Sequence, residues 1–102
     1  MNTGTPHVPP EVSFGRFRLD PVRRVLLEDG APSKLGARAI DLLLVLVQHR
    51  DRVVGKNELF DRVWPGLVVE ENNLQQHVSA LRKLLGQQAT VTVPGRGYQF
   101  AQ

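Results

Sequence analysis

The chain has 102 residues, of which 41% are hydrophobic and 23% are charged, with a net charge of +3 and no cysteine. This length suits one domain with a single modest core, and the composition is that of a globular protein. The lack of cysteine excludes disulfides, thiolate metal sites and a thiol nucleophile.

The N-terminal residues and the longest apolar run indicate in which compartment the protein is expected. Residues 1–11 lack the basic start and apolar stretch of a signal peptide and contain three prolines, so they predict a flexible leader before a domain over residues 12–102. The longest apolar run, Ile40–Val47, is interrupted by Asp41 and is far shorter than the roughly 20 residues that a membrane span needs. We therefore expect a cytoplasmic domain without membrane contact.

Residues 12–35 predict a small antiparallel sheet. Phe14–Asp20 and Val22–Glu28 are rich in β-favouring residues and flank an Asp-Pro turn. An Asp-Gly pair then precedes a third short strand that we expect near Ser33–Leu35.

Helical spacing of apolar residues follows. Ala37–Arg50 is apolar on nearly every face, which predicts a helix at the centre of the core, and Val53-Val54 predicts a brief extended segment. Lys56–Trp64 predicts a second helix that a Pro-Gly pair ends. Glu71–Leu85 predicts a third helix, which Gly86 ends, with an apolar stripe at Leu74, Val78, Leu81 and Leu85.

The last segment predicts a β-hairpin. Thr90–Val93 and Tyr98–Ala101 alternate polar and apolar residues, and the intervening Pro94-Gly95 pair suits the centre of a type II turn. A sheet, three helices and a hairpin in this order indicate an α+β fold, mainly helical, of the winged helix-turn-helix type.

The outward face of the third helix carries residues suited to DNA bases. Amides there can form paired hydrogen bonds with adenine in the major groove, and the start of such a helix approaches the bases. The alternative is an ordinary solvated helix face. The predicted base contacts are Asn72, Asn73, Gln76, His77 and Ala80.

Other side chains suit the DNA backbone and the minor groove. Arg96, between Gly95 and Gly97, places a cation on a slim hairpin tip that fits a narrow minor groove. Trp64 is expected in the core rather than as a base-stacking platform. The predicted phosphate contacts, which orient a protein without reading sequence, are Arg38, Lys56, Ser79, Arg82 and Lys83.

Five segments in order resemble the OmpR/PhoB-type DNA-binding effector domain of bacterial response regulators and related one-component regulators. The resemblance covers residues 14–102, and its hairpin is most similar to that of members in which this domain comes first. The matching segments are Phe14–Asp20, Ala39–Leu43, Glu58-Leu59 with Val63–Gly66, Val78–Gly86 and Thr92–Phe100.

This resemblance implies an N-terminal four-stranded sheet, a recognition helix in the major groove and a wing at the minor groove of promoter DNA. It implies tandem, often head-to-tail, binding to direct repeats. We expect the domain to be a monomer alone and a tandem dimer on DNA. It also implies RNA polymerase as a partner of the loop between the second and third helices, here Pro65, Gly66, Leu67 and Val68. The chain departs from the family pattern at two positions. Many relatives carry a basic residue where Ala80 stands, and several carry their wing arginine where Pro94 stands. We therefore expect its base preference and wing contacts to differ from those of such relatives.

Three other functional classes fit the sequence less well. An enzyme is not expected, because the three histidines are scattered and no paired carboxylates, nucleophile elbow or phosphate loop occurs. No metal and no cofactor are expected either. The alternative is a winged helix used for protein contact without DNA binding, while RNA binding is disfavoured by the absence of an exposed aromatic set.

Overall fold

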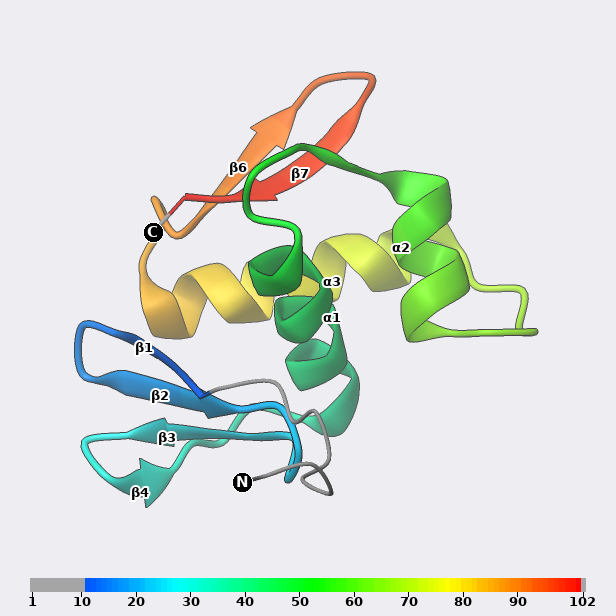
Figure 1. Ribbon diagram of the computed structural model, residues 1–102. Helices are drawn as coiled ribbons and strands as arrows, with labels where there is room; N and C mark the ends of the chain where they lie inside the picture. The colour runs from blue at the N-terminus through cyan, green and yellow to red at the C-terminus, as the bar shows by residue number, and fades with distance from the viewer. Residues whose placement is uncertain (1–10, 102) are drawn as a thin grey trace, which may run out of the picture. The chain divides into compact units, whose positions relative to one another are not determined.

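The computed structural model describes residues 11–101 (Figure 1). These residues divide into two compact units, one ending at Ser33 and the other beginning at Lys34. The predicted leader, except for Glu11, lies outside the described residues.

The first unit is a four-stranded antiparallel sheet, coloured blue to cyan in Figure 1, with the strands in chain order β1-β2-β3-β4. The four-stranded sheet that the resemblance implied is therefore confirmed. Apolar side chains that alternate along the strands, such as Leu19 and Leu26, are fully buried. The strands are β1 Val12–Phe14, β2 Phe17–Asp20, β3 Val25–Glu28 and β4 Ala31–Pro32.

Tight turns shift the strand boundaries from those predicted. The single strand expected over Phe14–Asp20 is wrong, because Gly15 adopts a φ of +58° and a two-residue turn joins β1 to β2. β3 begins only at Val25, because the side chain of Asp20 accepts the N–H groups of Val22 and Arg23 and holds the chain in a turn.

The last turn of this sheet corrects the predicted third strand. Asp29 and Gly30 both have positive φ, at +52° and +85°, as in a type I′ hairpin turn. Pairing resumes at once, between Glu28 and Ala31, so the strand predicted near Ser33–Leu35 lies instead at Ala31–Pro32.

The second unit contains three helices, of which α1 is central. α1 (Ala37–Gln48) packs against both α2 (Lys56–Val63) and α3 (Glu71–Leu85). The predicted first helix was two residues too long and the second one residue too long, since Trp64 is the C-cap of α2. The all-round apolar pattern of α1 explains its position, because its buried residues are Ala39, Ile40, Leu42, Leu43, Val45, Leu46 and Val47.

The bounds of α3 agree with the prediction. Its apolar stripe is buried, and Gly86, with a φ of +107°, ends the helix. Each buried leucine in such a stripe contributes about 1.5–3 kcal/mol to stability. The stripe thus fixes which side of α3 faces outward.

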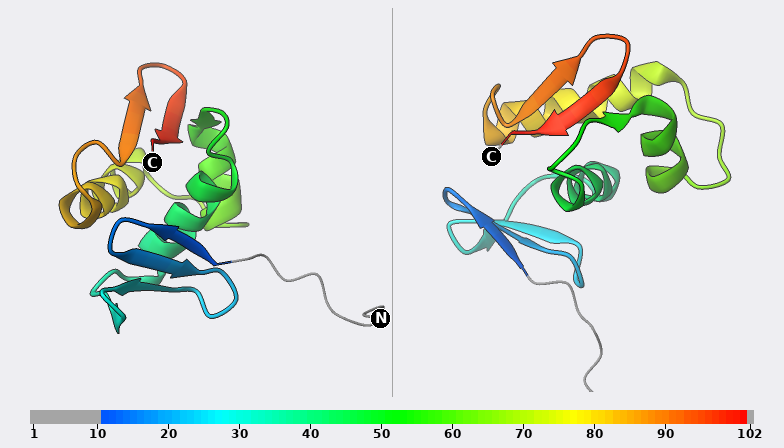
Figure 2. Two further views of the ribbon diagram at one scale, coloured as in Figure 1. Left: turned by 60° about the vertical axis from the view of Figure 1, so that its left-hand side comes forward. Right: turned by 45° about the horizontal axis from the view of Figure 1, so that its top comes forward.

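The wing hairpin is part of a three-stranded sheet. β6 (Thr90–Val93) and β7 (Gly97–Phe100) form the hairpin, and β5 (Val54–Gly55) pairs with the other edge of β7, as Figure 2 shows. The brief extended segment predicted at Val53-Val54 is therefore a strand one residue further along. β7 begins and ends one residue before the predicted Tyr98–Ala101.

The wing turn has the predicted conformation. Gly95 has a φ of +73°, and the N–H of Arg96 donates to the carbonyl of Val93 at 3.0 Å, as in a type II turn. Gly97 has no room for a side chain, because a Cβ there would overlap the carbonyl of Val54. The elements of both units agree with the predicted α+β, mainly helical class. None of the described helices is long and apolar enough to cross a membrane.

Candidate nucleic-acid interface

The outward face of α3 presents polar side chains to solvent. Asn72, Asn73, Gln76 and Ala80 are all exposed, opposite the buried leucine stripe. Within residues 11–101, the side-chain amides of Asn73 and Gln76 have no hydrogen-bond partner. These amides are therefore free to bind another molecule, and the two predicted phosphate contacts Ser79 and Lys83 are exposed on the same helix.

His77 lies differently from the other predicted base contacts. Its ring is partly buried and meets the Trp64 ring edge-on, with 5.4 Å between centroids. Its Nδ1 lies 2.7 Å from the carbonyl oxygen of Asn73, to which it donates, so Nε2 is the ring nitrogen left for another contact. Trp64 is 7% exposed and also contacts Phe60, which confirms its expected place in the core.

Lys56 lies at the start of α2 and is paired with the start of α3. Its ammonium donates to the carboxylate of Glu71 at 2.8 Å. This hydrogen bond raises the pKa of Lys56 and lowers the pKa of Glu71. A predicted phosphate contact thus has an internal anionic partner in the free protein.

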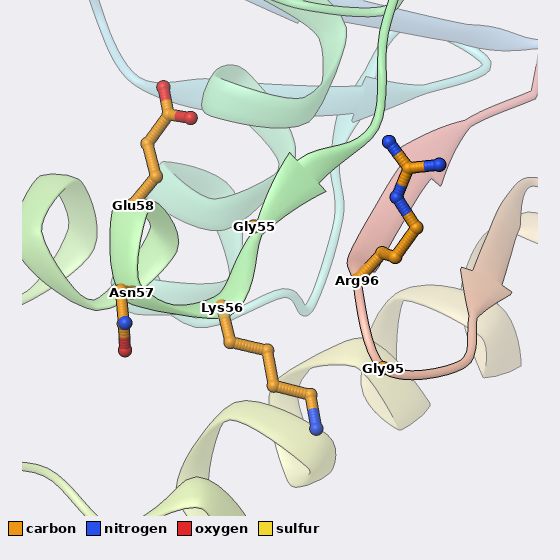
Figure 3. Close-up of a pocket in the computed structure, with 6 residues that line it drawn as sticks. All are labelled: Gly55, Lys56, Asn57, Glu58, Gly95 and Arg96. Carbon is orange, nitrogen blue, oxygen red and sulfur yellow. The ribbon is translucent and has the colours of Figure 1, made fainter.

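A hollow of about 340 Å³ joins the start of α2 to the tip of the wing (Figure 3). Lys56 and Arg96, which are 40 residues apart in the chain, both line it beside the positive end of a helix dipole, although their side chains point in opposite directions in Figure 3. Asn57 also lies here, and the sequence alone did not predict this, because only the pairing of β5 with β7 places the residue near the wing. The lining residues are Gly55, Lys56, Asn57, Glu58, Gly95 and Arg96.

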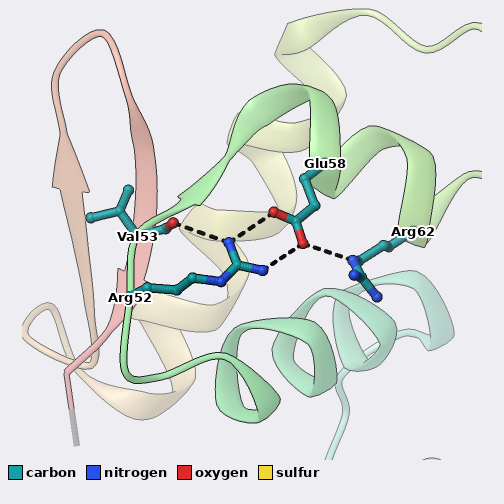
Figure 4. Close-up of polar contacts among 4 residues, drawn as sticks. All are labelled: Arg52, Val53, Glu58 and Arg62. Carbon is teal, nitrogen blue, oxygen red and sulfur yellow. Dashed lines mark hydrogen bonds and ion pairs between the residues drawn. The ribbon is translucent and has the colours of Figure 1, made fainter.

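Glu58, which lines this hollow, binds two arginines (Figure 4). Arg52 donates to both carboxylate oxygens at 2.9 and 2.7 Å, and Arg62 donates to one of them at 2.9 Å. The hydrogen bond from Arg52 is the main reason that the pKa of Glu58 falls to about 2. The cluster ties the segment before β5 to α2, and neither arginine is available as a free cation.

Two predicted phosphate contacts are engaged within the protein. Arg82 donates from Nε and Nη2 to Thr90 and Thr92 of β6, at 2.6–3.2 Å. Arg38 donates to the carbonyl of Val63 at 2.7 Å. Arg38 therefore lies at the opposite end of α2 from Lys56, across a helix of eight residues, and the structure does not bring these two cations together.

The loop between α2 and α3 is apolar and exposed. Leu67 is 59% exposed and Val68 is completely exposed, while Pro65 and Gly66 are also at the surface. Neighbouring exposed apolar side chains on a short loop are typical of a protein contact.

Comparisons with known proteins agree on one family. Residues 30–100 match the family described as "Transcriptional regulatory protein, C terminal". The phosphate regulon transcriptional regulatory protein PhoB of Pseudomonas aeruginosa is 36% identical over 94 residues, which cover 88% of this chain and 41% of PhoB. The transcriptional activator CadC of Escherichia coli is 33% identical over 97 residues, which cover 89% of this chain and 19% of CadC. The chain thus spans less than half the length of these relatives.

Solved structures show the same fold. The DNA-binding domain of CpxR from E. coli superposes with a TM-score of 0.76 at 27% identity, over 92% of this chain and all of the other. The DNA-binding domain of RstA from Klebsiella pneumoniae, in complex with the RstA box, superposes with a TM-score of 0.72 at 28% identity, over 89% and 96% of the two chains. The expected winged helix-turn-helix fold is confirmed. Because the family match covers more than half of its residues, the chain belongs to the OmpR/PhoB-type family of bacterial transcriptional regulatory domains.

Proposed function

We propose that the chain binds double-stranded promoter DNA in a sequence-specific manner and regulates transcription, with α3 in the major groove and the wing, residues 90–101, at the minor groove. The observation that carries this proposal is the exposed, unpaired amide face of α3 opposite its buried stripe. Asn and Gln amides pair with the adenine edge in the major groove, which is wide enough for a helix. The proposal includes no catalytic step and no cofactor.

The proposed contacts follow the positions of the side chains. Asn72, Asn73 and Gln76 read bases, His77 adds a contact through Nε2, and the methyl of Ala80 suits a thymine methyl. Lys56, Ser79 and Lys83 bind phosphates, and Arg96 enters the minor groove beside Gly95 and Gly97. Arg38 is not among these contacts, because it donates to the carbonyl of Val63 at the far end of α2.

The test is a selection of duplexes from a random pool, followed by titration of the enriched duplex at several salt concentrations. Each phosphate contact contributes about −0.9 to the slope of log affinity against log salt. Lys83→Gln is therefore expected to weaken binding to all sequences and to reduce the slope by about 0.9. A chain that enriches no duplex, or binds DNA with no salt dependence, contradicts the proposal.

A second function is supported by the exposed loop between α2 and α3. We propose that Leu67 and Val68, with Pro65 and Gly66, contact RNA polymerase while α3 holds the DNA. The double variant Leu67→Ser, Val68→Ser is expected to lose binding of purified polymerase to the DNA-bound chain and to retain its affinity for DNA. If neither binding changes, the loop is not the contact. If polymerase binds the wild type equally well without DNA, protein contact rather than DNA binding is the primary role.

A further inference from the structure

Arg82 joins the last turn of α3 to the first strand of the wing. Its Nε donates to the hydroxyl of Thr90 at 2.9 Å, and its Nη2 donates to the carbonyl of Thr90 at 3.2 Å and to the hydroxyl of Thr92 at 2.6 Å. We call these three hydrogen bonds the Arg82 bridge. They use the Nε–Nη2 edge of the planar guanidinium, whose fixed donors allow bidentate hydrogen bonding.

Burial shows that the bridge is part of the packed structure. Thr90 is 2% exposed and is the one buried polar residue among residues 11–101. Its hydroxyl receives a hydrogen bond from Arg82, and no buried side-chain nitrogen or oxygen in the described part of the chain lacks a partner. Breaking the bridge would leave that hydroxyl unsatisfied, which is costly in a core.

The position of β6 explains why the wing needs such a contact. β6 is an edge strand, because it pairs with β7 on one side alone. The Arg82 bridge connects β6 directly to the helix whose other face carries Asn73 and Gln76. It therefore links the position of the wing tip to the face of α3 that carries Asn73 and Gln76.

We propose that Arg82 is a positioning residue, which acts by holding the wing in register with α3 so that Arg96 and the amides of α3 engage one duplex together. This inference rests on the proposed DNA binding and revises the predicted role of Arg82 as a simple phosphate contact. Two contact points held on one rigid body bind more tightly than two that must be ordered on binding. Thr92 is the partner best suited to a test, because it accepts the shortest of the three hydrogen bonds and is exposed, so that a substitution there leaves the core intact.

The experiment compares variants that separate charge from geometry. Arg82→Lys keeps the positive charge and loses the planar fork, while Thr92→Val removes only the acceptor. Each is expected to weaken binding of the selected duplex about five- to tenfold, with the salt slope unchanged. Lys83→Gln is the matched control, because it removes a neighbouring exposed charge outside the bridge and lowers the salt slope instead.

A double-mutant cycle with Arg96→Ala tests the coupling. If the bridge places the wing tip, Arg96→Ala costs at least about threefold less affinity in the Arg82→Lys and Thr92→Val backgrounds than in the wild type. Thermal unfolding checks that each variant is folded, and Thr92→Val, at an exposed position, remains informative if Arg82→Lys does not fold.

Three outcomes overturn the inference. One is wild-type affinity in Thr92→Val, and another is an equal cost of Arg96→Ala in every background. The third, a wild-type chain that binds no duplex, removes the proposed function and the inference together, whereas the first two leave the proposed function intact.

Discussion

Asn73 and Gln76 differ from the cations of this surface because their amides can distinguish one base pair from another. Both are exposed on α3 and have no hydrogen-bond partner within residues 11–101. Asn73→Ala or Gln76→Ala is expected to cost about 1–3 kcal/mol on the preferred duplex and almost nothing on unrelated DNA, because a paired base contact is lost. Competition between the selected duplex and random DNA measures both values.

The control is Ser79→Ala, at a proposed phosphate contact, which should instead weaken binding to both kinds of DNA alike. If all three variants behave in the same way, the division between base and phosphate contacts is wrong.

Glu71 restrains the cation nearest to it. Its carboxylate accepts the hydrogen bond from Lys56, and a phosphate at that position would compete with it. Glu71→Gln removes the competing charge and is expected to raise affinity for random DNA several-fold, with a smaller gain on the selected duplex. The measurement is the ratio of the two affinities at one salt concentration. Glu70→Gln serves as the control, because it removes the adjacent exposed carboxylate, which lies outside the hydrogen bond between Lys56 and Glu71. An equal gain there would show a general charge effect.

The contacts of Glu58 tie α2 to the segment before β5 and make the stability of the fold depend on pH in acid. Its pKa is about 2 in the folded chain, against an ordinary value of 4.5, mainly because Arg52 hydrogen bonds to its carboxylate. A lowered pKa gives stability that is fully present above about pH 4.5 and is lost as the pH falls toward 2. Urea unfolding of Glu58→Gln should therefore show a lower midpoint at neutral pH, and the difference from the wild type should shrink across this range.

The control for that prediction is Asp61→Asn, which removes a carboxylate from the same helix outside the cluster of Arg52, Glu58 and Arg62. Its midpoint should follow that of the wild type with pH. Parallel loss of stability in Glu58→Gln and the wild type would show that the cluster does not contribute to acid unfolding.

At the scale of the whole molecule, one copy offers a small set of contacts to DNA. Its net charge is +3, and the proposed base contacts come from a single helix. If two copies bind adjacent half-sites and contact each other there, each raises the affinity of the other for the duplex. We expect sedimentation to show a monomer without DNA, and two copies on a direct repeat with about one helical turn between half-sites. A preference for an inverted repeat, or a stable dimer without DNA, would contradict the tandem arrangement.

The sequence predicted best what depends on local spacing. The stripe from Leu74 to Leu85 determined both the bounds of α3 and its outward face, and the Pro94-Gly95 pair determined the wing turn. Strand ends were less predictable, because the backbone at Gly15 and Asp29 turns more tightly than a β-favouring pattern reveals.

Contacts between distant segments left no local pattern. The pairing of Val54 with Tyr98 and the fit of Gly97 against Val54 join segments more than 40 residues apart. The Arg82 bridge depends on that tertiary arrangement too, so a helical arginine looked like any exposed cation. The i,i+4 pair of Glu58 and Arg62 was visible in the sequence, whereas the stronger partner Arg52 was not.

The three residues between Val93 and Gly97 take no part in strand pairing, whereas Gly97 is packed against β5. An insertion among those three residues would lengthen the tip and leave every paired residue in register, while an insertion after Gly97 would reverse the facing of Tyr98 and Phe100. The length of this loop can therefore vary without a change in the register of the strands. The same property makes residues 94–96 a suitable place to graft a loop from another regulator, which would change the minor-groove contact and leave the base-reading residues of α3 unchanged.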